Sequence, residues 1–189
     1  PLDERPIGSA SYRPSRTAAP PALSRARVTA PFATGIRSID ALATVGQGQR
    51  VGVFSPAGVG KSTLLGMLAR QSQCDVRVVA LIGERGREVG EFIDLNLRDH
   101  MATTVLVVAT SDRSAVERVN AAYTATTIAE HFRDAGKSVL LLFDSVTRFA
   151  LASREIGLAA GEPPTVRGFP PSFFATIPKI VERMGCSER

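Results

Sequence analysis

From about residue 32 onward, the chain alternates between short apolar runs and longer amphipathic stretches. Four runs are rich in leucine or β-branched residues and have the length of buried strands; they cover residues 51–54, 76–82, 104–109 and 139–143. Apolar residues recur at helical spacing in five longer stretches, which cover residues 61–73, 88–99, 114–135, 146–156 and 172–184. Strands that alternate with helices favour right-handed crossovers. The pattern therefore predicts an α/β fold with a mainly parallel sheet that helices cover on both faces.

The longest of the predicted helices, at residues 114–135, carries its own start and stop signals. Ser114 and Glu117 have the spacing of a capping box, in which each side chain bonds the backbone N–H of the other residue. Gly136 suits the left-handed conformation that commonly ends a helix. These signals predict that the helix fills the whole stretch between them.

Residues 1–31 differ from the rest of the chain in composition. They hold six of the twelve prolines and show no apolar period, which predicts an extended linker or docking arm rather than a folded unit. Five arginines against two acidic residues in this segment account for three of the five net positive charges of the chain. We therefore divide the chain into an Arg/Pro-rich arm, residues 1–31, and a nearly neutral folded domain, residues 32–189. A nucleic-acid surface needs a larger excess of positive charge than this domain has.

Composition excludes two further classes of protein. The longest apolar runs are far shorter than the roughly 20 residues that a membrane-spanning helix needs. The two cysteines, Cys74 and Cys186, are too few for a disulfide framework and form no metal-binding pair. The first residue is not methionine and the last residues carry no helix stop signal, so we expect a piece of a longer protein.

The strongest motif lies between the run at residues 51–54 and the helix that is predicted to open at Lys61. The sequence from Ser55 reads Ser-Pro-Ala-Gly-Val-Gly-Lys-Ser-Thr, a phosphate-binding P-loop in which Ser55 replaces the usual first glycine. In such a loop the backbone N–H groups and the helix N-terminus cradle phosphates; the residues concerned are Ala57, Gly58, Val59, Gly60, Lys61, Ser62 and Thr63. Lys61 is expected to contact the β- and γ-phosphates of ATP, and the Ser62 hydroxyl to bind Mg²⁺. The alternative is an ordinary glycine-containing turn before a core helix.

A second magnesium ligand is expected at the end of another buried strand. The apolar run at residues 139–143 is followed by Asp144, which places a carboxylate at the edge of the sheet where open α/β sheets bind ligands. We expect Asp144 to hold Mg²⁺, through water. The alternative is that Asp144 only caps the helix that follows.

Residues 83–90 crowd four charged side chains behind the run at residues 76–82. ATP hydrolysis needs a carboxylate that polarises the attacking water and cations that balance the charge of the transferred group. Glu84 is the candidate for the carboxylate, and Arg85 for a residue that positions it or contacts phosphate. Arg148, four residues after Asp144, is the candidate for a contact to the γ-phosphate. The alternative is a solvated cluster of charges.

Six segments from Arg27 to the end of the chain together resemble the type III secretion ATPases, of both the injectisome and the flagellar export branch. These segments are residues 34–40, 48–52, 58–65, 80–89, 144–150 and 154–164. The resemblance implies a RecA-like P-loop NTPase core, here incomplete, that is related to the catalytic β subunit of the F-type ATP synthase. It also implies that Glu84 polarises the attacking water and that Arg148 is the arginine of the Walker B segment. The tripeptide that begins at Cys74 favours the injectisome branch.

The same resemblance implies partners and a location. Its members are homohexamers at the cytoplasmic base of the secretion apparatus, peripheral to the bacterial inner membrane and attached to it only through the apparatus. They contact stator and stalk proteins, and they use ATP with Mg²⁺ to release effectors from chaperones and unfold them for export. An N-terminal β-barrel, the rest of the core, an arginine finger, the adenine contact and a C-terminal helical domain are expected outside this segment. We therefore expect the 189 residues alone to bind Mg-nucleotide weakly and to hydrolyse it slowly.

Three other interpretations remain open at the level of sequence. The chain could serve flagellar export, it could be a catalytically silent nucleotide-binding or assembly module, or it could translocate RNA. The low charge of the folded part speaks against RNA. The loop at residues 157–168, rich in glycine and proline, could contact a partner or act as a rigid connector.

Overall fold

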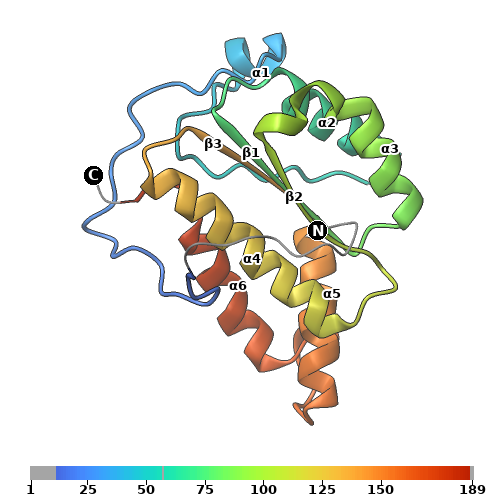
Figure 1. The fold of residues 1–189 in the computed structure, drawn as a ribbon. Helices are drawn as coiled ribbons and strands as arrows, with labels where there is room; N and C mark the ends of the chain where they lie inside the picture. Colours follow the sequence, from blue (N-terminus) through green and yellow to red (C-terminus); the bar gives the residue numbers. More distant parts are fainter. Residues whose placement is uncertain (1–11, 57, 188–189) are drawn as a thin grey trace.

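A computed structural model describes residues 12–56 and 58–187 and contains a three-stranded parallel sheet (Figure 1). Its strands are β1 (Val76–Ile82), β2 (Thr104–Ala109) and β3 (Val139–Asp144), in the order β2-β1-β3. In the central strand, Val79 pairs with Leu106 on one side and with Leu142 on the other. Because both edges of β1 are paired and helices cover both of its faces, its residues from Arg77 onward are buried. The predicted α/β fold with a parallel sheet is confirmed.

Six α-helices and two short 3-10 helices accompany the sheet in the described residues. They are α1 (Arg37–Leu42), α2 (Lys61–Gln71), α3 (Gly86–Asn96), η1 (Arg98–Thr103), α4 (Ala115–Asp134), α5 (Val146–Ala159), η2 (Val166–Gly168) and α6 (Pro171–Arg183). The five predicted helices correspond to α2, α3, α4, α5 and α6, with ends that shift by up to three residues. None of the described helices is long and apolar enough to cross a membrane.

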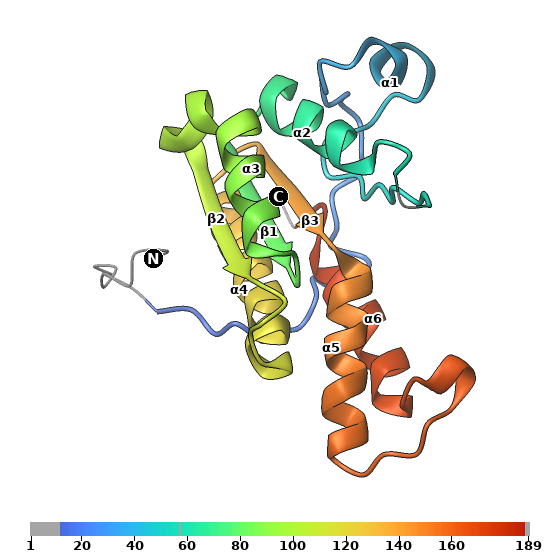
Figure 2. The same ribbon diagram turned by 90° about the vertical axis from the view of Figure 1, so that its right-hand side faces the viewer.

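The helices form two layers around the sheet (Figure 2). On one face, α2 and α3 bury Ala69 and Val89 against Val79 and Leu81 of the central strand. On the other face, α4 packs small residues such as Ala125 against the remaining side chains of β1. Burial of alternate strand residues on opposite faces is what a two-sided sheet requires. Helices α5 and α6 pack beside α4 and extend away from the sheet as a hairpin.

The start of α4 follows its sequence signal in detail. The backbone N–H of Glu117 donates to Ser114 Oγ at 3.3 Å, and the backbone N–H of Ser114 donates to Glu117 Oε2 at 3.0 Å. After the helix ends, Gly136 adopts a φ of 77°. The predicted capping box and glycine stop are confirmed.

The predicted strand at residues 51–54 is wrong. These residues are extended but pair with no strand of the sheet, and the side chains of Val51 and Phe54 are 58% and 95% exposed. An apolar run becomes a strand only where a neighbouring strand satisfies its backbone N–H and C=O groups and a core covers its side chains. The outer edges of β2 and β3 have no partner strand in the described residues, yet this four-residue run, which Gly52 further weakens, pairs with neither. The sheet therefore has three strands in the described residues, where the sequence predicted four.

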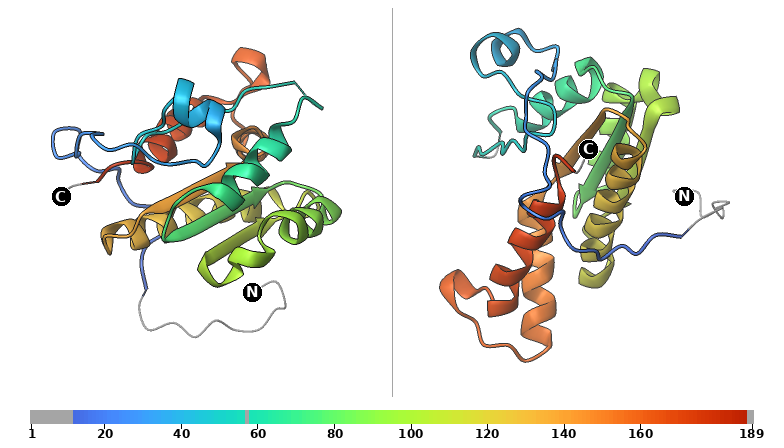
Figure 3. Two further views of the ribbon diagram at one scale, coloured as in Figure 1. Left: turned by 90° about the horizontal axis from the view of Figure 1, so that it is seen from above. Right: turned by 90° about the vertical axis from the view of Figure 1, so that its left-hand side faces the viewer.

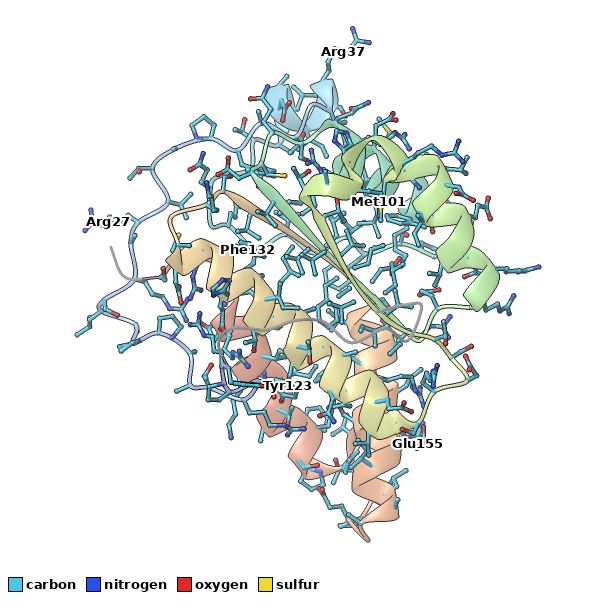
Figure 4. All side chains as sticks on the ribbon, in the orientation of Figure 1. Arg27, Arg37, Met101, Tyr123, Phe132 and Glu155 are labelled. Carbon is cyan, nitrogen blue, oxygen red and sulfur yellow. The ribbon has the colours of Figure 1, made fainter. Side chains whose placement is uncertain are left out.

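The described part of the arm, residues 12–31, crosses α4 and α6 without forming a helix (Figure 3). The guanidinium of Arg16 lies 4.5 Å from the ring centroid of Tyr123, a residue of α4 that is labelled in Figure 4. Arg183 of α6 donates to the backbone oxygen of Ser15 at 2.7 Å. Arg13 forms an ion pair with Asp134 at the end of α4. The arm is thus a docked segment in its described part.

Candidate nucleotide site

The loop before α2 has the backbone geometry of a phosphate cradle. Gly58 and Gly60 adopt φ values of 80° and 99°, which side chains other than glycine rarely tolerate. A Cβ atom at either position would meet no other atom, so conformation and not space requires glycine there. No side chain caps the start of α2, and its first N–H groups therefore remain available to an anion. Ala57 of the predicted cradle lies outside the described residues.

The first residue of α2 reaches the end of β3. Lys61 Nζ lies 2.5 Å from Asp144 Oδ1, and the side chains of the two residues are 33% and 12% exposed. The carboxylate is nearly buried, so the ammonium group compensates a charge that burial would otherwise penalise. The structure therefore brings together the lysine of the loop and the aspartate of the predicted magnesium site.

Glu84 lies beside this pair, directly after β1. Its backbone is fixed at the edge of the sheet, because the N–H of Gly83 donates to Ala109 O at 2.6 Å and the N–H of Ser111 donates to Glu84 O at 3.0 Å. Its carboxylate is 15% exposed and lies 3.9 Å from Nε of Arg148. Gly83 permits this approach, since a Cβ atom there would come within 3.0 Å of the Arg148 side chain.

Burial raises the pKa of Glu84 above its ordinary value, and the negative charge of Asp144 and a hydrogen bond with Glu88 raise this pKa further. The charge of Arg148 acts in the opposite direction and is the weaker influence. A carboxylate whose pKa is raised in this way is a stronger base than an exposed glutamate, which suits a group that accepts hydrogen bonds or protons from water. Perturbed carboxylates in a hollow are typical of functional sites.

A hollow between α2, α3 and the ends of β1 and β3 joins these groups. Its lining includes Ser62 and Thr63 of the loop motif as well as Glu84 and Asp144. Glu88 and Glu91 of α3 extend the lining, which makes the hollow strongly acidic. The sequence analysis gave no role to these two glutamates. The spacing of these glutamates could have revealed them in the sequence. Glu88 follows Glu84 by four positions, and Glu91 lies about one helical turn further along α3.

The two candidate arginines occupy different positions. Arg148 faces Glu84, as described above. The side chain of Arg85 is 66% exposed, and its ion-pair partner is Glu88, at 3.9 Å. Arg85 precedes α3 and extends toward solvent, so Arg148 is the arginine that contacts the candidate carboxylate.

The residues of the hollow have the oxygen donors that Mg²⁺ prefers. Ser62 of α2 supplies a hydroxyl and Asp144 of β3 a carboxylate to its lining. No group of three or more His, Cys, Asp or Glu side chains in the described part of the chain could hold a metal ion unaided. An ion that is shared with phosphates needs only one or two protein ligands, so this pair of donors fits magnesium.

Comparison with known proteins finds a family model and several relatives that match the chain. Residues 35–189 match the model of the ATP synthase alpha/beta family, nucleotide-binding domain. The type 3 secretion system ATPase of Xanthomonas euvesicatoria is 58% identical over 183 residues, which cover 96% of this chain and 41% of that protein. The flagellum-specific ATP synthase of Bacillus subtilis strain 168 is 52% identical over 190 residues, which cover 100% of this chain and 43% of that protein.

Solved structures give the same result. The assembled ATPase EscN from the type III secretion system of enteropathogenic E. coli is similar with a TM-score of 0.88 and 52% identity, covering 97% of this chain and 46% of that chain. The structure of assembled EscN in complex with its central stalk EscO gives a TM-score of 0.87 and 53% identity, covering 96% of this chain and 46% of that chain. The chain thus spans less than half the length of each of these relatives.

Proposed function

The chain belongs to the ATP synthase alpha/beta family through its nucleotide-binding domain, and from this membership we propose that it binds Mg-ATP as part of an ATPase that drives type III protein export. The observation that carries the proposal is that Glu84 and Asp144 line one hollow at the ends of the parallel strands, with Lys61 paired to Asp144. Ligands of open α/β sheets bind at this edge.

The loop and the start of α2 bind the phosphates of ATP in this proposal. Backbone N–H groups from Gly58 to Thr63 face the phosphate oxygens, and the N-terminus of α2 adds the positive end of its dipole. Lys61 leaves Asp144 and contacts the β- and γ-phosphates, which are the stronger anionic partner. Ser62 and Asp144 would hold Mg²⁺, which when bound neutralises charge on the β- and γ-phosphates.

Glu84 orients the water that attacks the γ-phosphate. Its raised pKa favours acceptance of a hydrogen bond from that water, and Arg148 keeps the carboxylate in place. Because Arg148 lies beside Glu84, a γ-phosphate that enters the hollow next to Glu84 is also within reach of Arg148. Arg85 lies at the rim, where its exposed guanidinium is free to approach phosphate from solvent.

The biological process that we propose is the export of effector proteins by an injectisome. Support comes from the similarity to the secretion ATPases of Xanthomonas euvesicatoria and of enteropathogenic E. coli. In this role the chain is part of a homohexamer at the cytoplasmic base of the secretion apparatus, peripheral to the inner membrane, where it releases effectors from chaperones. Flagellar export is the nearest alternative, since a flagellum-specific relative is 52% identical.

A stalk protein is a further proposed partner, because EscN has been solved with its central stalk EscO. The hairpin of α5 and α6 suits such a contact. Its connecting loop is internally braced, since Arg154 donates to Gly168 O at 2.7 Å and Glu162 accepts from the backbone N–H of Ser172 at 3.0 Å. The hairpin still exposes apolar surface, with Val166 of the loop 66% and Phe174 of α6 47% accessible.

A catalytically silent nucleotide-binding module is a second candidate. The observation that favours it is the unpaired segment at residues 51–54, because the loop that follows it is not anchored to the sheet from that side. Such a module would bind nucleotide but leave it intact. Phosphate release from bound ATP separates this candidate from the ATPase.

Titration of the chain with a fluorescent ATP analogue, with Mg²⁺ or with EDTA, tests the proposal. We expect saturable binding that Mg²⁺ strengthens and that unlabelled ATP reverses. A folded chain that fails to bind the analogue under both conditions would contradict the proposed function.

A further inference from the structure

Arg77 is a buried arginine at the far end of the sheet from the nucleotide hollow. It lies in the central strand β1, its residue is 5% exposed, and no carboxylate of the described residues forms an ion pair with it. Its guanidinium donates instead to three oxygens of other elements. Nε donates to Ala69 O at 2.7 Å, Nη2 to Ser72 O at 2.8 Å and Nη1 to Thr103 Oγ1 at 3.4 Å.

The two carbonyl groups explain why a buried charge is tolerated at this position. Ala69 and Ser72 form the C-terminal end of α2, where the last carbonyls of a helix lack partners within the helix and carry its negative partial charge. Both residues are almost fully buried, so water does not compete for these carbonyls. The planar guanidinium holds two of them at once, which fixes the direction of the helix end as well as its distance from β1.

The two elements that Arg77 joins also carry the candidate site at their other ends. Helix α2 starts with Lys61 and Ser62, and β1 is followed by Glu84. Helices and paired strands are stiff. A shift of the C-terminal end of α2 relative to β1 therefore changes the distance between the start of α2 and the residues that follow β1. The bond from Ser72 Oγ to Thr34 O is long, at 3.5 Å, and residues 51–54 give the loop no sheet anchor.

We propose that Arg77 is a positioning residue that sets the place of the phosphate cradle relative to the sheet edge bearing Glu84 and Asp144. The assignment rests on the proposed nucleotide site. Its specific consequence concerns Mg²⁺, because Ser62 on α2 and Asp144 on β3 must approach the same ion. The phosphate cradle itself belongs to α2 and its loop, and it moves with them as a unit.

The test compares binding of a fluorescent ATP analogue in Mg²⁺ and in EDTA for the wild-type chain, Arg77→Met and Arg77→Lys. The Mg²⁺-dependent gain is the ratio of the affinity in Mg²⁺ to the affinity in EDTA. We expect this ratio to fall about tenfold in Arg77→Met, because small displacements of bound groups are costly. The affinity in EDTA is expected to stay unchanged. Arg77→Lys keeps the charge but loses the planar fork, and we expect an intermediate loss.

Arg133→Met is the matched control. Arg133 of α4 donates to Arg183 O at 3.2 Å and to Gly185 O at 3.4 Å, carbonyls at the end of α6, so it braces a helix end that is remote from the hollow. We expect this variant to lower thermal stability and to leave the Mg²⁺-dependent gain unchanged. All measurements are made at a temperature at which circular dichroism shows each variant to be folded.

The possible outcomes separate the two proposals. Binding by the wild-type chain, with an unchanged Mg²⁺-dependent gain in folded Arg77→Met or Arg77→Lys, would overturn the role of Arg77 alone. An equal loss in Mg²⁺ and in EDTA, or a similar loss in Arg133→Met, would show a general structural effect and would also overturn it. A wild-type chain that binds no nucleotide would overturn the proposed function and the positioning role together.

Discussion

Lys61 and Asp144 are 83 positions apart in the sequence, yet Nζ of the lysine lies 2.5 Å from Oδ1 of the aspartate. The pair joins the first residue of α2 to the last residue of β3. In the proposed site each partner has another role: Lys61 contacts phosphate and Asp144 binds Mg²⁺. Nucleotide binding is therefore expected to exchange this ion pair for contacts with Mg-ATP.

Replacement of Lys61 by alanine is expected to weaken binding of a fluorescent ATP analogue by about 10- to 100-fold, the range that follows from losing a hydrogen bond to a charged group. The measurement is a fluorescence titration in Mg²⁺. Lys137→Ala removes an exposed lysine from another part of the molecule and serves as the control. Equal affinities of the Lys61 and Lys137 variants would show that Lys61 does not contact the phosphates.

Replacement of Glu84 by glutamine is expected to leave binding intact and to lower hydrolysis by about 10²- to 10⁴-fold, the usual contribution of a positioned base. An amide cannot accept a proton from the attacking water. The measurement is phosphate release from pre-bound ATP, with Asp94→Asn on the exposed side of α3 as the control. If the Glu84 variant releases phosphate as fast as the control, the base has been assigned to the wrong residue.

The same substitution is expected to change stability in a pH-dependent way. The pKa of Glu84 is raised in the folded chain, first by burial and then by Asp144, so protonated Glu84 favours folding. This stability is fully present below the ordinary pKa of glutamate and is lost as pH rises through the raised pKa. Glu84→Gln should therefore be more stable than the wild type at neutral pH, and the difference should vanish near about pH 4.

Denaturant unfolding at several pH values measures this effect, and Glu162→Gln provides a control of opposite sign. Hydrogen bonds from Ser172 lower the pKa of Glu162, so its ionised form stabilises the folded chain. Glu162→Gln should accordingly be less stable than the wild type at neutral pH. Identical pH profiles for wild type and Glu84→Gln would contradict the raised pKa.

A buried ion pair between α4 and α6 gives a prediction about the fold alone. Arg183 Nε and Nη2 lie 2.9 and 2.7 Å from the two oxygens of Glu130, and the two side chains are 1% and 5% exposed. Glu130→Ala leaves the arginine charge buried without a compensating negative charge, which is expected to cost about 3–5 kcal/mol of unfolding free energy. Glu130→Gln keeps an acceptor and should cost less, so it covers the case in which the alanine variant does not fold.

Denaturant unfolding measures these costs against Asp94→Ala. That control breaks an exposed pair with Arg98, whose loss is expected to cost below about 1 kcal/mol. A Glu130→Ala variant no less stable than Asp94→Ala would mean that the buried pair contributes little to the fold.

Much of the fold could be predicted from the sequence because the relevant signals are local. The bounds of β1 and β2 match the predicted runs, and the capping box places the start of α4 at Ala115. The three residues at the centre of the site, Lys61, Glu84 and Asp144, could also be predicted. Each lies at or close to the end of a loop or strand whose direction is already fixed by the parallel topology.

The failures concern features that depend on distant neighbours. Residues 51–54 have the composition of a buried strand, but no strand of the described sheet pairs with them. The sequence made Arg85 the candidate for positioning Glu84 and Arg148 the candidate for the γ-phosphate, and only the packing of α5 against Gly83 places Arg148 beside Glu84. Nothing in the local pattern around Arg77 shows that its partners are carbonyls of α2.

The sequence by itself determined the five long helices, the three strands that form the sheet, the place of the phosphate loop and the carboxylates at the strand ends, because backbone preferences and alternating polarity are properties of neighbouring residues. Only the tertiary structure decided that Lys61 pairs with Asp144, that Arg148 faces Glu84 and that two arginines are buried. The physical reason is that the energy of a charge depends on which groups surround it and exclude water, and those groups come from parts of the chain that only folding brings together.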